Sequence, residues 1–131
     1  MKVLHIIDTL WLGGAQTIVK DLFESKFDNN YFLYALRKTK HTINVNHSNV
    51  TIRNSHSRLS FWLLIELYKI IKNNNINILH CHLPRSIVMG YLLKRFCFPN
   101  IKLIVHKHGT IFEKSLMLPF ILKTINRYVD I

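Results

Sequence analysis

Short apolar runs alternate with longer amphipathic stretches along this chain. The runs are rich in branched aliphatic and aromatic residues, and they predict strands at 2–8, 31–36, 49–53, 76–82 and 101–106. The stretches between them repeat apolar residues every three or four positions and predict helices at 15–25, 59–72, 84–96 and 115–128. This alternation is typical of an α/β fold with a doubly wound parallel sheet and helices on both faces.

The end of the chain begins the strand pattern again. Residues 128–131, Tyr-Val-Asp-Ile, look like the first residues of a sixth strand. A length of 131 residues fits one domain. We therefore expect residues 1–131 to form one domain, and an end on the first residues of a strand suggests truncation.

The predicted fold indicates where a ligand would bind. In open parallel sheets, ligands bind outside the carboxyl ends of the strands. The segments that follow strands there are 8–14, 82–85 and 106–113.

Composition and charge narrow the classes of partner. Hydrophobic residues make up 49% of the chain, and 18 basic against 7 acidic residues give a net charge of +11. Such a surface attracts phosphorylated ligands, anionic lipid or nucleic acid. The tightest basic cluster is only 37–40, without the aromatic interleaving of RNA-binding signatures, so no specific nucleic-acid partner is expected.

Cysteine content and hydropathy bear on location. Cys81 and Cys97 are too few for a disulfide framework in a chain with a sizeable core, which favours a reducing, cytoplasmic setting. No stretch reaches about 18 uncharged apolar residues, so no bilayer-spanning segment is predicted.

The loop after the first predicted strand carries Gly13 and Gly14, with Gln16 close behind. Glycines allow backbone to approach a ligand, and the start of the next helix offers unpaired N–H groups to a phosphate or sugar hydroxyl. A tight turn would explain the two glycines equally well.

Two H-x-H pairs end neighbouring predicted strands. His80 and His82 face one side of the sheet because residues two apart on a strand do so, and His106 and His108 repeat the arrangement. Imidazoles so placed could hold a metal. No carboxylate lies near either pair in sequence, so we favour one buried, hydrogen-bonded histidine per pair, with the other facing a ligand cleft.

Polar residues at the other strand ends complete the candidate cleft. His108, Gly109 and Thr110 follow the last strand, where glycine permits a sharp exit and the histidine can hydrogen-bond a hydroxyl or phosphate. Arg85 and Ser86 open a helix, where an anion or polar acceptor can be met. Capping and surface charge are equally good explanations for this second pair.

Together these segments resemble the N-terminal domain of family 4 glycosyltransferases, which have the GT-B fold. The resemblance covers the whole chain and lies in the ordered set of the opening strand at 2–8 with GGAQ at 13–16, ILHCHLPRS at 78–86, VHKHG at 105–109 and YVDI at 128–131. It implies a Rossmann-like acceptor-side domain, one half of a GT-B enzyme. The other half would bind the nucleotide-sugar donor and carry paired glutamates.

The resemblance also implies roles for residues. Gly13 and Gly14 would form the loop near the donor phosphates and acceptor, and His108 would be the catalytic histidine that contacts the transferred sugar. Gln16 stands where the family often has glutamate.

The implied enzyme is a retaining transferase that uses a nucleotide-diphosphate sugar, with no cofactor or metal, in surface polysaccharide or glycolipid synthesis. Without the donor domain the chain should be inactive. Two alternatives stay open: a metal-dependent hydrolase using His80, His82, His106 and His108, or a non-enzymatic basic binding module.

A membrane contact fits the basic charge. Such enzymes often act on lipid-linked acceptors at the inner membrane face, and the predicted helix at 59–72 carries Phe61, Trp62, Lys69 and Lys72. The same aromatics would serve equally well as core or interdomain contacts.

Overall fold

The computed structural model describes residues 1–25, 29–54, 60–106, 123, 125 and 129. Five strands and three helices span these residues in the order β1 (Val3–Ile7), α1 (Gly14–Ser25), β2 (Tyr31–Ala35), β3 (Val50–Ile52), α2 (Phe61–Asn74), β4 (Ile78–His82), α3 (Pro84–Phe96) and β5 (Lys102–His106). The helix predicted at 115–128 and the strand start at 128–131 fall almost entirely outside the described residues.

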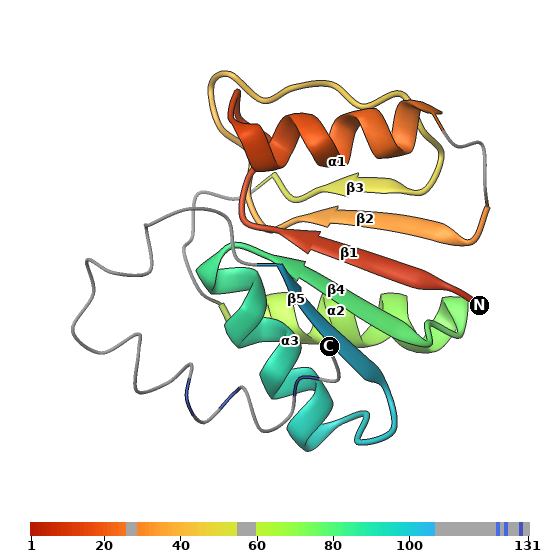
Figure 1. The fold of residues 1–131 in the computed structure, drawn as a ribbon. Helices are drawn as coiled ribbons and strands as arrows, with labels where there is room; N and C mark the ends of the chain where they lie inside the picture. The colour runs from red at the N-terminus through yellow and green to blue at the C-terminus, as the bar shows by residue number, and fades with distance from the viewer. Residues whose placement is uncertain (26–28, 55–59, 107–122, 124, 126–128, 130–131) are drawn as a thin grey trace.

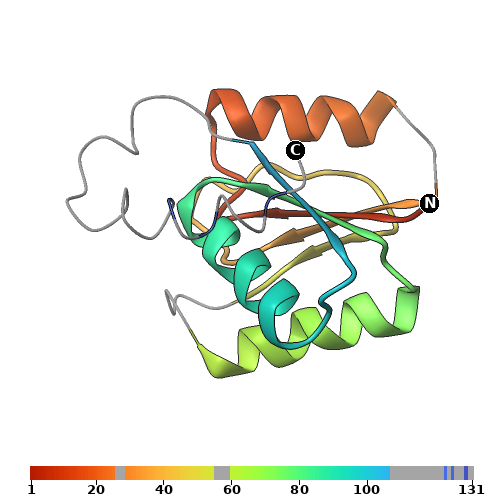
Figure 2. The same cartoon turned by 60° about the horizontal axis from the view of Figure 1, so that its bottom comes forward.

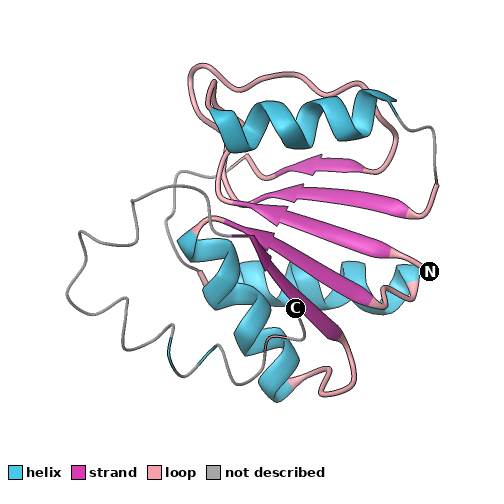
Figure 3. Ribbon diagram, viewed as in Figure 1, coloured by secondary structure: helices cyan, strands magenta, loops and turns pink. Residues whose placement is uncertain are grey.

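The strands form one sheet in the order β3-β2-β1-β4-β5, and every pair is parallel. All five arrows therefore run the same way (Figure 3). Helix α1 covers one face, while α2 and α3 cover the other (Figures 1 and 2). The predicted Rossmann-like α/β fold is confirmed.

The strand order reverses direction between β1 and β4. The chain winds outward from β1 to β3 on one side, then crosses back so that β4 pairs with β1 on the other side. Open α/β sheets bind ligands at such a switch point, just beyond the carboxyl ends of its strands.

Alternate residues of each strand pack into two separate cores. Leu4, Ile6, Leu79 and Cys81 face α2 and α3. Ile7 packs on the opposite face with Val19 and Phe23 of α1. The alternation places His5, His80 and His82 on the α1 side of the sheet, as the two-residue spacing predicts for the H-x-H pair.

Helix α2 begins and ends later than its hydrophobic pattern indicates. Ser60 adopts extended backbone and accepts a 3.2 Å hydrogen bond from the Trp62 amide, so the helix begins at Phe61. Asn75 ends it in the left-handed conformation with φ of 53°. Both caps are local polar signals that apolar periodicity does not contain.

Gly90 sets how closely α3 approaches the sheet. A Cβ atom there would lie 2.4 Å from Cys81 Sγ and 3.0 Å from Leu103 Cδ1. Both partners are fully buried on neighbouring strands, β4 and β5. The absence of a side chain at Gly90 therefore allows the middle of α3 to pack directly on these strands.

We expect Gly90→Ala to lower the free energy of unfolding by about 1–3 kcal/mol, because the added methyl overpacks the core. The cost should shrink by about 1 kcal/mol or more in a Cys81→Ala background, since the sulfur is the nearer obstacle. Denaturant unfolding of the wild type, both single variants and the double variant measures this coupling. Strictly additive effects would contradict the proposed contact.

Candidate functional site

The loop after β1 is fixed at the carboxyl edge of the sheet by the segment after β2. The Ile43 amide donates a 2.6 Å hydrogen bond to the Leu10 carbonyl, and Trp11 forms a bridge with Thr42. Leu10 is buried, while Trp11 and Leu12 are exposed. The loop thus has a buried anchor and an open rim.

Gly13 and Gly14 differ in what surrounds them. A Cβ at Gly13 would lie 2.6 Å from Gln16 Oε1, whereas a Cβ at Gly14 would meet no atom of the described residues within 4 Å. The Gly13 carbonyl accepts hydrogen bonds from both the amide and the hydroxyl of Thr17, so it caps α1. Gly13 therefore makes room for Gln16 of its own helix.

The start of α1 fits the predicted anion site. Among the described residues, no acceptor is bound to the first three amides of the helix, those of Gly14, Ala15 and Gln16. Unpaired amides at a helix N-terminus favour negative charge.

The start of α3 is different, because Asp8 of the first loop already occupies it. The Asp8 carboxylate accepts hydrogen bonds from the Ser86 amide at 2.8 Å and the Arg85 amide at 3.4 Å. The Ser86 hydroxyl donates to the carbonyls of His82 and Leu83. Ser86 is fully buried with both donors engaged within the chain, which favours the capping alternative for this residue over a direct contact with the acceptor.

Leu83 joins β4 to α3 in a strained conformation. Its φ of 77° lies where side chains other than glycine are rarely found. Hydrogen bonds from the Ile87 amide and the Ser86 hydroxyl to its carbonyl hold it there. Such strain concentrates at functional edges. Arg85 lies two residues further on, at the start of α3, and is half-exposed.

Burial raises the pKa of Asp8 above its usual value, and the Ser86 and Arg85 hydrogen bonds and the charges of Arg85 and Arg37 lower it in part. Arg37 is a site residue that the sequence analysis missed. Its amide donates to the Asp8 carbonyl at 3.2 Å, and its buried Nε has no hydrogen-bond partner in the part of the chain that the structure describes. The sequence did contain a signal for Arg37, because this residue directly follows the second predicted strand, 31–36.

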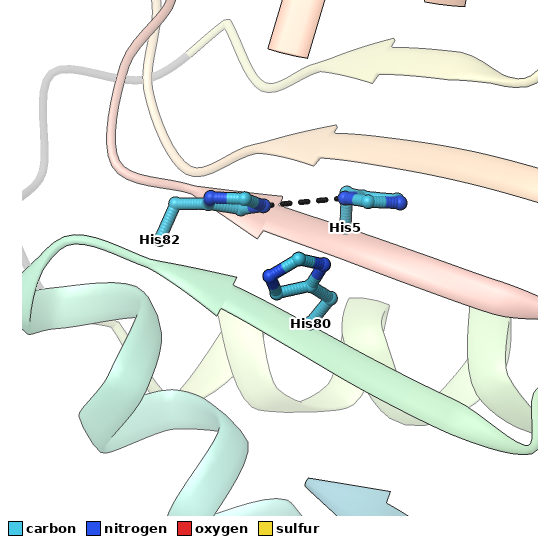
Figure 4. A group of neighbouring side chains, drawn as sticks. All are labelled: His5, His80 and His82. Carbon is cyan, nitrogen blue, oxygen red and sulfur yellow. Dashed lines mark hydrogen bonds between the residues drawn. The ribbon is translucent and has the colours of Figure 1, made fainter. Parts of the chain in front are cut away.

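His82, which the sequence analysis places in a segment of the candidate acceptor cleft, is buried, with 2% of its surface exposed. Its Nε2 lies 3.2 Å from Nδ1 of His5 in a buried hydrogen bond between β1 and β4 (Figure 4). The expectation of one buried, hydrogen-bonded histidine in this pair is confirmed. His80 is partly exposed, with its ring centroid 4.2 Å from that of His82.

The second pair is only half described. His106 is exposed and in register with His82, with ring centroids 5.7 Å apart. His108, Gly109 and Thr110 lie outside the described residues. The structure therefore brings His80, His82 and His106 together and adds His5, a cluster member that the sequence analysis missed.

A sequence model described as Glycosyltransferase Family 4 matches residues 13–130. The chain belongs to this family. The fold agrees with the match, because a parallel sheet flanked by helices is what one half of a GT-B enzyme has. A search of curated proteins finds no match to the chain. Family membership favours a glycosyltransferase over the hydrolase and the non-enzymatic module.

For this family 4 domain we expect Asp8→Ala to lower the free energy of unfolding by about 1–3 kcal/mol near neutral pH, because the buried Ser86 amide loses its acceptor. Asp8→Asn keeps an acceptor oxygen and should cost less. Thermal or denaturant unfolding ranks the three proteins, and equal stability of the two variants would contradict the capping role.

The pH dependence of the stability difference between the wild type and Asp8→Asn tests whether the pKa of Asp8 is raised. A folded state in which the pKa of Asp8 is raised binds more protons than the unfolded state. The wild type should therefore gain stability relative to Asp8→Asn as pH falls through the folded pKa towards the unfolded value of about 3.9. An opposite slope would show that the hydrogen bonds outweigh burial.

Proposed function

We propose that this domain is the acceptor-binding half of a retaining, sugar-nucleotide-dependent glycosyltransferase that acts in surface polysaccharide or glycolipid synthesis and whose sugar transfer requires no metal or cofactor. The observation that carries the proposal is the family match together with a polar edge at the switch point of the sheet. The cleft between this edge and a donor-binding domain would then determine the donor sugar, the acceptor and the linkage.

The chemistry of the edge supports handling of negative charge. The unpaired amides at the start of α1 and the cations Arg37 and Arg85 all belong to segments that follow β1, β2 and β4. A leaving nucleoside diphosphate develops charge during sugar transfer, and preorganised amides and cations stabilise it. Asp8 contributes indirectly by fixing the turn that carries Arg85.

The remaining roles are assigned by resemblance. His108 would contact the transferred sugar, Gly109 and Thr110 would line the acceptor side, and Gln16 would lie beside the glycine loop. A donor-binding domain with paired glutamates would supply the opposite wall. We place the enzyme in the cytoplasm at the inner membrane face.

A binding experiment tests the acceptor-side role. Saturation-transfer NMR with a panel of mono- and disaccharides should show at least one sugar bound by the chain, and Arg85→Ala should weaken its binding about tenfold. Lys102→Ala is the matched control, because Lys102 is an exposed cation at the opposite, amino edge of the sheet. Equal loss in both variants would contradict a site at the carboxyl edge.

A transfer assay tests whether the donor site lies outside this domain. With radiolabelled nucleotide sugars and the bound saccharide, the chain alone should form no product, since the proposed donor site lies in another domain. Product formed by residues 1–131 alone would overturn the half-enzyme role while leaving family membership intact.

Membrane association is the second part of the proposal, and a groove between α2 and α3 supports it. The groove, about 470 Å³ in volume, has an almost wholly apolar lining that includes Phe61, Leu64, Tyr68, Leu92 and Phe96. Phe61 and Phe96 are both 74% exposed.

The rim of this groove combines aromatic and cationic groups. Trp62 is 68% exposed beside Phe61, so these two aromatics are not core residues of this domain, while an interdomain contact stays an alternative. Arg95 lies 5.8 Å from the centre of the Phe96 ring, and Lys72 lies 5.9 Å from that of Tyr68. Aromatics flanked by cations suit the interface of an anionic bilayer. No helix in the described part of the chain is long and apolar enough to cross a membrane.

We expect the chain to sediment with vesicles that contain phosphatidylglycerol, and less with neutral phosphatidylcholine vesicles, with binding weakened by salt. Replacing Phe61 and Trp62 together by serine should reduce binding about tenfold or more. Ile18→Ser is the control, because Ile18 is an exposed apolar residue on α1, which covers the other face of the sheet. Equal binding by the wild type and the double variant would exclude this surface as the contact.

A further inference from the structure

Three imidazoles from two neighbouring strands converge on the α1 side of the sheet. His5 lies on β1, His80 and His82 lie on β4, and their rings face one another (Figure 4). One ring nitrogen from each can be chosen so that all three lie within 4.8 Å of one another. Because the register pairs His5 with His80, sheet pairing itself sets this convergence.

We propose that His5, His80 and His82 form a binding site for a zinc-class divalent transition-metal ion. The proposal goes beyond sugar transfer and does not depend on it. It also departs from the expectation of no metal, which rested on the family resemblance and on no carboxylate lying near either H-x-H pair in sequence. The fold supplies a further ligand from β1, a strand more than seventy residues away in sequence.

The closest contact has the separation expected of two ligands on one ion. His5 Nδ1 and His82 Nε2 are 3.2 Å apart. Two nitrogens bound to one tetrahedral zinc at about 2.0–2.1 Å are separated by about 3.4 Å. Sharing an ion would require the two rings to rotate so that both lone pairs point at it, with His80 approaching from within 4.8 Å.

The surroundings keep the imidazole of His5 in the ligand form. Burial, and secondarily the nearby His80, lower the pKa of His5 to about 3, so its ring is neutral at physiological pH. A neutral ring nitrogen offers the lone pair that a metal needs. His80 is partly exposed and gives the ion a way in, whereas His5 and His82 are buried.

The donor set selects the kind of ion. Three imidazole nitrogens suit Zn²⁺, Co²⁺, Ni²⁺ or Cu²⁺ better than Mg²⁺ or Ca²⁺, which prefer oxygen ligands. Cys81 lies between the two histidines of β4, but its side chain faces α3 on the other side of the sheet. The fourth position is left to water, and an ion here would tie β1 to β4 directly beneath the switch point.

Titration of the chelator-treated chain with Zn²⁺ by calorimetry, and with Co²⁺ by visible absorption, tests the site. We expect one ion per chain and the intense absorption of four-coordinate Co²⁺. His80→Ala should weaken binding about 100-fold, since loss of outer-shell partners alone costs about 10–100-fold. His41→Ala is the control, because His41 is an exposed histidine beside Trp11, outside the cluster.

Thermal unfolding gives an independent readout that also checks folding of the variants. Saturating Zn²⁺ should raise the Tm of the wild type and of His41→Ala but not that of His80→Ala. Binding that is absent, or that survives His80→Ala unchanged, would overturn the proposal and leave a hydrogen-bonded histidine cluster. Neither outcome bears on acceptor binding, so the failure of this inference is distinguishable from failure of the proposed function.

Discussion

The parallel pairing of β1 with β4 is the contact on which the rest of the structure depends. It joins the two halves of the sheet at the point where the winding reverses, with Ile7 in register with His82. That register brings the ends of both strands to the same level. Asp8 then reaches the first amides of α3, and the loop after β1 lies beside the turn after β4.

The N-termini of α1 and α3 both lie at this edge, but they differ in whether their first amides are hydrogen-bonded. The start of α3 is occupied by Asp8, a carboxylate from its own chain. The start of α1 has no such internal partner among the described residues. A ligand anion would therefore meet α1, while α3 acts as a fixed support that carries Arg85. Asp8 accepts hydrogen bonds from the first amides of α3. Its carboxylate is buried in doing so, and burial raises its pKa.

The two faces of the sheet carry different chemistry. The α1 face holds the polar histidine cluster close to the switch point, and the other face holds the tight Gly90 contact and the apolar groove of α2 and α3. Both arise from strand alternation, since His80 and Cys81 are neighbours in sequence yet point to opposite layers. Strand β4 thus contributes His80 and His82 to the polar cluster on one face and Cys81 to the tightly packed core on the other.

The sequence by itself determined the elements, the parallel α/β class and the shared face of His80 and His82, because hydrophobic periodicity and strand alternation are local properties. It also indicated the carboxyl edge as the place for a site. Only the tertiary structure decided which polar groups there are free. The partnership of His5 with His82, the burial of Ser86 under Asp8 and the exposure of Trp62 all depend on strand order and helix packing, which join residues far apart in the chain.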